Sequence, residues 1–276
     1  MLCEICNKKL KIYKTLKEFN LLRCHDCAHT VSDIKVNKKY YKKTYSKTYV
    51  YKKHKNWMNN PNFELFKKIN LFIKSKKNGN IIDLGCGIGN FLNYLYNENN
   101  KYNLTGVDLI AKKVNKKSKI KFIKKEIFKY NPKSLFSFIV SIAVIEHIPK
   151  VKLFINHIKR ISKKNSYCVI LTVNTNSFLY KIANFLYSIN LKTPLLRLYD
   201  PHHLNHFSNK SLEKIFKKNG FKVIQRVKTP ISMKQIDFNY NNVLMKFFFY
   251  FGVSIILKLE NFFNKSWLQT VIFKKG

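Results

Sequence analysis

An acidic residue followed by three alternating glycines is the stretch best suited to hold a ligand. Residues Asn80–Leu92 read Asn-Ile-Ile-Asp-Leu-Gly-Cys-Gly-Ile-Gly-Asn-Phe-Leu. The apolar start predicts a buried strand over Ile81–Leu84, and a helix is expected to begin at Asn90. Glycine lets the backbone approach a ligand closely, and a helix N-terminus offers unpaired N–H groups. A dinucleotide fingerprint would need glycine at position 90, so the spacing favours another kind of nucleotide pocket. The pocket residues are Asp83, Gly85, Gly87 and Gly89; a glycine loop without a ligand is the alternative.

A second carboxylate stands at a matching distance. Tyr102–Asp108 predicts a short strand whose last residue, Asp108, lies 19 residues after Gly89. A carboxylate in this position suits the two ribose hydroxyls of a bound nucleoside. The alternative is that Asp108 only caps the helix that follows.

Four cysteines near the N-terminus have the spacing of a metal site. Cys3-x-x-Cys6 and Cys24-x-x-Cys27 are separated by 17 residues, as expected for two knuckles that together bind one Zn²⁺. Paired disulfides are the alternative, and an intracellular chain disfavours them. Four thiolates complete a structural zinc site, so His25 and His29 are not expected to be ligands.

The remaining chain alternates predicted helices and strands, which indicates an α/β fold. The expected helices cover Pro61–Lys77, Lys152–Ser162, Ser177–Tyr187 and Ser211–Asn219. The further expected strands cover Lys119–Ile123, Leu135–Ala143, Tyr167–Val173, Phe221–Val227 and Leu268–Lys274.

These motifs, in this order, resemble the class I S-adenosylmethionine-dependent methyltransferases. The resemblance covers about residues 61–228 and includes the glycine motif, Asp108, the Glu146-His147 pair after the fourth strand, and the run from His203 to Ser208. It implies a Rossmann-like sheet of seven strands flanked by helices, with S-adenosylmethionine as the cofactor. The glycines would admit the methionine part, and Asp108 would fix the ribose. In this family an acidic residue after the third strand receives the adenine amino group, which implies Glu126 with Ile127 packed on the ring.

The same resemblance suggests how an acceptor is activated. The loop carrying Glu146 and His147 would border the transferred methyl group, so His147 is the candidate general base. A role of His147 in ordering the loop is the alternative. Metal-dependent enzymes that methylate RNA 3′ ends have a further glutamate where this chain has Ala143. That leaves Glu146, His147 and the downstream histidines as an incomplete set for Mg²⁺ or Mn²⁺.

The overall composition is strongly basic. The formal net charge is +39, from 53 Lys+Arg against 14 Asp+Glu, which indicates an anionic partner or the compositional drift of an AT-rich genome. No signal peptide opens the chain and no apolar run reaches the length of a membrane span, so a cytoplasmic protein is expected. Residues 35–60 form a connector rich in Lys and Tyr that can bind nucleic acid or lie on the main domain.

The apolar run Phe247–Leu257 is too short to span a bilayer. It predicts an interfacial helix at an anionic membrane, such as the inner membrane face. The alternatives are a helical cover over the sheet and a dimer contact. We therefore expect a zinc-ribbon-like segment at 1–34, the connector at 35–60, and a methyltransferase domain at 61–276 with a variable insertion at 231–264. The expected activity is O-methylation of a small or lipid-linked metabolite, such as a surface-sugar precursor or a quinone-like phenol. The alternatives are an RNA methyltransferase and a non-catalytic nucleic-acid binder with a degenerate cofactor fold.

Overall fold

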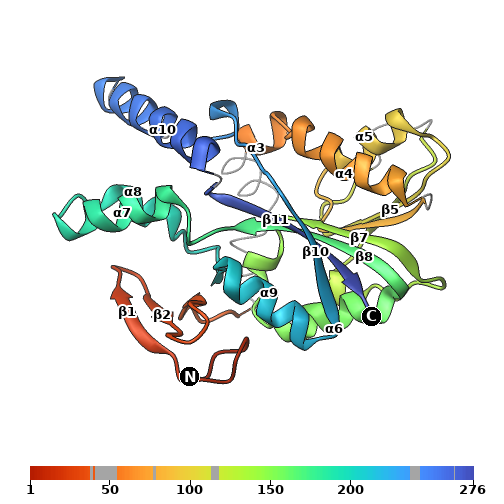
Figure 1. Ribbon diagram of the computed structural model, residues 1–276, viewed down its shortest axis with the longest axis horizontal. Helices are drawn as coiled ribbons and strands as arrows, with labels where there is room; N and C mark the ends of the chain where they lie inside the picture. The colour runs from red at the N-terminus through yellow and green to blue at the C-terminus, as the bar shows by residue number, and fades with distance from the viewer. Residues whose placement is uncertain (38–39, 41–54, 77–78, 113–117, 237–242, 264) are drawn as a thin grey trace.

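A computed structural model describes residues 1–37, 40, 55–76, 79–112, 118–236, 243–263 and 265–276. These residues form a seven-stranded sheet in the order β10-β11-β8-β7-β4-β5-β6 (Figure 1). Strands β8, β7, β4, β5 and β6 are parallel, and β11 is antiparallel to both of its neighbours. The predicted α/β fold with a seven-stranded sheet is confirmed. The strands are β4 (Asn80–Leu84), β5 (Asn103–Asp108), β6 (Lys121–Lys124), β7 (Phe136–Ile142), β8 (Ser162–Val173), β10 (Phe221–Val227) and β11 (Leu268–Lys275).

Helices cover both faces of this sheet (Figure 1). Successive side chains of a strand point to opposite faces, so Ile81 packs with α4 (Phe63–Ser75) and α5 (Asn90–Glu98), whereas Ile82 packs with α6 (Val151–Ile161) and α9 (Asn209–Lys218). Each central strand is apolar on both sides, as a parallel strand between two helical layers must be.

Strand β8 begins earlier than the sequence indicates. It starts at Ser162, directly after α6, and its pairing with β7 shifts register between Phe136 and Phe138. The polar residues 163–165 are exposed, so the hydrophobic pattern locates only the part of the strand from Tyr167 onward.

Three helices extend from one end of the sheet (Figure 1). They are α7 (Phe178–Ser188), α8 (Thr193–Leu198) and α10 (Val243–Phe263). Within the described ranges, none of the helices has both the length and the hydropathy that a membrane crossing requires. The short helical turns are η1 (Ile127–Lys129), η2 (Ile145–His147) and η3 (Met233–Gln235).

The N-terminal segment joins a second, smaller sheet. Strands β1 (Lys11–Thr15), β2 (Asn20–Arg23) and β3 (Thr30–Ser32) pair in order, and β3 then pairs antiparallel with β9 (Asn205–His206). A mid-chain strand therefore completes the N-terminal sheet. Most of the predicted connector lies outside the described residues; its end forms α3 (Lys55–Asn59), where Asn56 Nδ2 donates to Ile236 O.

Candidate active site

The glycine turn links β4 to α5 in a conformation that suits glycine. Gly85, Gly87 and Gly89 have φ angles of 80°, 53° and 84°, in the left-handed region that residues with a Cβ rarely adopt. A Cβ on Gly85 would lie 2.3 Å from Val144 Cγ2, and one on Gly89 would lie 2.5 Å from the Phe122 ring. A Cβ on Gly87 would meet no atom of the described residues within 4 Å. The outer two glycines therefore allow close packing, and the middle one borders open space.

Asp108 lies at the end of β5, beside this turn. Its Oδ2 accepts a hydrogen bond from Gly87 N at 2.9 Å, and its Oδ1 accepts one from Ile110 N at 2.9 Å. Burial raises the pKa of this carboxyl group, while the backbone hydrogen bonds oppose the shift. Each oxygen keeps a second lone pair, so the carboxylate can accept two more hydrogen bonds from a ligand.

Asp83 is the buried member of this pair of carboxyl groups. Burial, and then the nearby Asp108, raise its pKa to about 8. Its Oδ1 has no hydrogen-bond partner among the described residues. A buried, unpaired carboxyl oxygen is costly, so its position close to the open turn fits a ligand that brings a positive charge or an N–H donor.

Glu126 and Ile127 follow β6 at the same edge of the sheet. Lys124 pairs with Asp108, and Lys125 N donates to Asp108 O, which places Glu126 just beyond Asp108. The Glu126 side chain is half exposed and pairs with Lys129 at 3.0 Å. Ile127 is partly buried against the core. Their predicted contacts with adenine remain a prediction.

The turn η2 after β7 carries Glu146 and His147. Glu146 is buried, and burial raises the pKa of its carboxyl group to about 7 although Thr172 Oγ1 donates to it at 2.9 Å. His147 Nδ1 lies 2.9 Å from His202 O. A carbonyl oxygen only accepts, so Nδ1 carries the proton and Nε2 of the neutral ring has the lone pair. His147 is therefore held in the tautomer that a general base needs.

Two further histidines surround His147. Its ring stacks on that of His202 with centroids 5.1 Å apart, and His203 lies at 4.9 Å. His202 Nδ1 in turn contacts Asp200. These three imidazoles are close enough to share a metal ion. Asp200 is not among the residues predicted from the sequence. The feature that could have indicated it is an acidic residue directly before Pro201-His202-His203.

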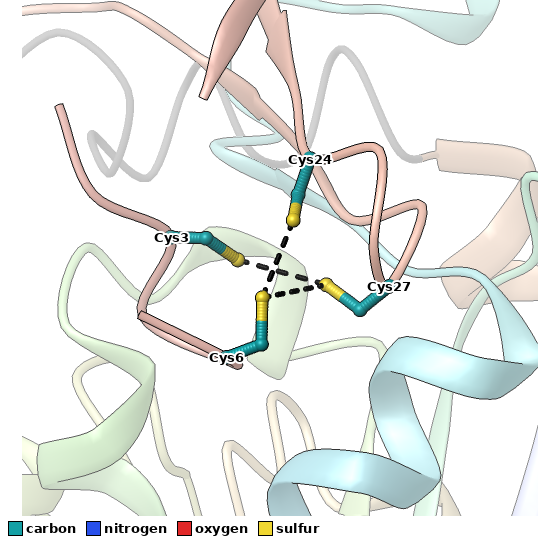
Figure 2. Close-up of side chains that lie close together, drawn as sticks. All are labelled: Cys3, Cys6, Cys24 and Cys27. Carbon is teal, nitrogen blue, oxygen red and sulfur yellow. Dashed lines mark hydrogen bonds between the residues drawn. The ribbon is translucent and has the colours of Figure 1, made fainter. Parts of the chain in front are cut away.

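The four N-terminal cysteines converge on one point (Figure 2). The Sγ atoms are 3.6 Å apart for Cys3 and Cys27, 3.3 Å for Cys6 and Cys24, and 3.7 Å for Cys6 and Cys27. Four sulfurs around Zn²⁺ at about 2.3 Å would be about 3.8 Å from one another. The cysteines are free thiols, and the donor set fits tetrahedral zinc.

The two cysteine knuckles have the same backbone conformation. In each, the first cysteine's carbonyl accepts from the residue four positions later, and that residue, Asn7 or Ala28, has a positive φ. Each knuckle also contacts the main sheet's helices through an acidic side chain. Glu4 Oε2 accepts from Val151 N at 2.7 Å at the start of α6, and Asp26 forms an ion pair with Lys214 on α9.

The β9 segment connects this ribbon to the loop at 145–148 that carries Glu146 and His147, which we call the histidine loop. Asn205 Oδ1 lies 3.0 Å from His29 Nε2, and Asn205 Nδ2 donates to Ile148 O at 2.7 Å. On the same segment, Leu204 N donates to Glu146 O at 2.8 Å. Burial lowers the pKa of His29 to about 4, so it is neutral here. His29 is not a metal ligand candidate but a bridge between the ribbon and the site.

Comparisons with known proteins agree with this geometry. Residues 58–226, more than half of the chain, match the profile described as a methyltransferase domain. No curated protein sequence matches. Among solved structures, the plantazolicin methyltransferase BpumL in complex with a triazolic desmethylPZN analog and SAH has 17% identity and a TM-score of 0.56, with 85% of this chain and 94% of that chain covered.

Two more structures share the fold. The Burkholderia thailandensis 1,6-didemethyltoxoflavin-N1-methyltransferase has 9% identity and a TM-score of 0.55, covering 96% of this chain and 99% of that one. Magnesium protoporphyrin IX methyltransferase from Synechocystis PCC 6803 has 12% identity and a TM-score of 0.50, covering 88% and 90%. The glycine turn, the two carboxyl groups and the matched profile together show that this chain belongs to the methyltransferase domain family.

Proposed function

We propose that this protein transfers a methyl group from S-adenosylmethionine to an oxygen of a small or lipid-linked acceptor. The observation that carries the cofactor assignment is that Asp83 Oδ1 is buried without a hydrogen-bond partner among the described residues, at the start of the turn in which Gly87 has a left-handed backbone and borders open space. Two structural neighbours support a small acceptor, because they were solved with a triazolic desmethylPZN analog and with 1,6-didemethyltoxoflavin.

Each residue at the turn is proposed to contact a different part of the cofactor. Gly87 leaves room for the methionine part, Asp83 lies near a positively charged group of the cofactor, and Asp108 accepts hydrogen bonds from the ribose hydroxyls. Glu126 and Ile127 are proposed to contact the adenine. When bound, S-adenosylmethionine supplies an electrophilic methyl group on a sulfonium. The chain then has to orient the acceptor in line and exclude water.

His147 is proposed to take the proton of the acceptor hydroxyl. Its Nδ1–H is fixed on His202 O, so Nε2 is the basic atom. Glu146 is proposed to hold this loop in place from the buried side through Thr172. The four cysteines are proposed to bind one structural Zn²⁺, which takes no part in methyl transfer.

Transfer of a labelled methyl group tests the proposed acceptor. The protein is incubated with S-adenosylmethionine labelled on the methyl group and with a cell extract, which is then separated into lipids, small metabolites, RNA and protein. Label in the lipid or small-metabolite fraction supports the proposal. Label in RNA alone would replace it with the RNA methyltransferase alternative.

The His147→Gln variant tests the base. We expect it to bind S-adenosylmethionine with unchanged Kd in a calorimetric titration but to transfer little label, and we expect wild-type transfer to rise with pH as the imidazole loses its proton. If added Mn²⁺ or Mg²⁺ stimulates wild type and not the variant, His147 is a metal ligand rather than a base. No heat with wild type would remove the cofactor assignment altogether.

A further inference from the structure

We propose that the apolar, cationic surface of α7, α8 and α10 docks on an anionic lipid membrane. We call this surface the helical tip and define it as residues 178–198 and 243–263. The docking does not depend on methyl transfer, but it deepens the proposed function because it brings a lipid-linked acceptor to the site.

The helical tip exposes many large apolar side chains. Among the side chains of α10 that the structure describes, Val253 and Leu257 are buried in the core, and Glu260 is buried as well. More than half of the exposed large apolar residues in the described parts of the chain belong to the tip. They are Phe185, Ile189, Leu191, Leu196, Val243, Leu244, Phe247, Phe248, Tyr250, Phe251, Ile255, Leu259, Phe262 and Phe263. Exposed apolar side chains gathered on helices that contact one another, as α7 contacts α8 and α10, mark an interaction surface.

The charge of the tip identifies the partner. Lys181, Lys192 and Lys258 are exposed on it, and Arg197 stacks on the Phe249 ring at 5.3 Å. The only acidic residue in its two ranges is Glu260. Glu260 is buried, where it accepts hydrogen bonds from Leu179 N and Trp267 N. The exposed surface therefore combines apolar and cationic groups without an exposed carboxylate, which suits the headgroup and acyl boundary of an anionic membrane.

A second copy of the chain fits this surface less well. A symmetric dimer contact places the same patch on both partners, so the exposed lysines would face each other without acidic groups to neutralise them. RNA would use the lysines but would leave most of the phenylalanines exposed.

The tip lies at the edge of the sheet where the candidate site lies. Helix α7 follows the end of β8, α10 precedes the start of β11, and Val173 and Leu268 at those two points are paired. This is the carboxyl edge of the parallel strands, at which the glycine turn and His147 also stand. Helix α8 then leads within a few residues to Asp200 and His202. A membrane that receives the tip would thus lie on the side of the sheet at which the candidate site stands.

Vesicle co-sedimentation of the full chain without cofactor tests this proposal. Wild type is expected to bind vesicles of phosphatidylglycerol and phosphatidylcholine and to bind pure phosphatidylcholine much more weakly. Each lysine near an anionic surface contributes a factor of about five. The pair Lys181→Ala and Lys192→Ala should therefore lower partitioning by roughly 25-fold. As a control, Lys163→Ala and Lys164→Ala remove equal charge from exposed residues at the opposite end of β8.

A charge-matched pair of variants tests the apolar contribution. Phe247→Glu, Phe248→Glu and Phe251→Glu replace side chains that are 58% to 67% exposed. Phe63→Glu, Leu71→Glu and Leu153→Glu make the same change in net charge at side chains that are 52% to 57% exposed on α4 and α6. The first set should reduce vesicle binding by about ten-fold or more, and the second set should have little effect. Equal loss in both sets would overturn the proposal, as would full binding by the first set.

Fluorescence quenching locates the contact directly. With brominated acyl chains in the vesicles, Phe251→Trp should be quenched and Phe63→Trp should not, since Trp57 and Trp267 give the same background in both. Absence of quenching at position 251 would overturn insertion of the tip. Two other outcomes would also overturn the proposal. In one, the phenylalanine variant turns a dimer into a monomer in vesicle-free solution; in the other, RNA binding replaces vesicle binding and depends on Lys181 and Lys192. None of these measurements requires methyl transfer. A failure of the membrane proposal can therefore be distinguished from a failure of the proposed methyltransferase activity.

Discussion

Replacing Asp108 with asparagine should weaken cofactor binding by a predictable amount. In wild type, Oδ1 and Oδ2 each accept one backbone hydrogen bond, from Ile110 N and Gly87 N, and each has one lone pair left for a ribose hydroxyl. The Asp108→Asn amide removes the charge and turns one acceptor into a donor. A hydrogen bond to a charged group contributes about 1.5–3 kcal/mol. The Kd for S-adenosylhomocysteine should therefore rise roughly 10- to 150-fold.

A double-mutant cycle by calorimetry separates this contact from general damage. S-adenosylhomocysteine is compared with an analogue that lacks both ribose hydroxyls, in wild type and in Asp108→Asn. The analogue should bind wild type weakly, and the substitution should then cost little more. As a matched control, Asp33→Asn alters an exposed aspartate that also accepts a backbone hydrogen bond, from Asn20 N, and should leave the Kd unchanged. If the loss of binding free energy from the substitution and the loss from removing the ribose hydroxyls simply add, Asp108 does not hold the ribose.

Three further predictions concern the turn and the ribbon. Folding raises the pKa of Asp83 from 3.8 to about 8, so the folded protein favours the protonated carboxyl group. The thermal midpoint of the ligand-free protein should fall as pH rises between these two values, and Asp83→Asn should flatten that fall in calorimetric scans at several pH values. Gly89→Ala, with its Cβ against the Phe122 ring, should lower the thermal midpoint by more than Gly87→Ala. In a cofactor titration, by contrast, Gly87→Ala should weaken binding more than Gly89→Ala does, because Gly87 is proposed to border the ligand. Equal binding by wild type and Gly87→Ala would argue against a ligand beside Gly87. Elemental analysis should find one zinc per chain in wild type and in Cys86→Ser but little in Cys24→Ser, and a zinc-free wild type would refute the metal assignment.

Much of the fold and the glycine turn was predictable because their causes are local. The apolar run before Asp83 forms β4, and the left-handed angles at Gly85, Gly87 and Gly89 require glycine in the positions where the sequence has it. The spacing of the cysteines likewise predicts their convergence, since each pair lies on one tight turn.

The rest depends on contacts between distant parts of the chain. Nothing near Asn205 in the sequence indicates that its side chain joins His29 to Ile148. The two-residue strand β9 is too short for a hydrophobic pattern, so its pairing with β3 was not predicted. The run Phe247–Leu257 was identified as apolar, but which of its sides is buried follows only from the packing of α10 against α7 and the core.

The pairing of β3 with β9 also has a consequence for synthesis of the protein. Val31 pairs with Asn205, which is 174 positions later in the chain, so β9 is made much later than β3. At ordinary rates of translation this interval lasts roughly 10 to 35 s. During it the two knuckles can already bind a metal, while the edge of β3 has no strand beside it and is open to pairing with other chains. We therefore expect the ribbon to keep an open edge during synthesis until Asn205 arrives, pairs with Val31 and donates to Ile148 O.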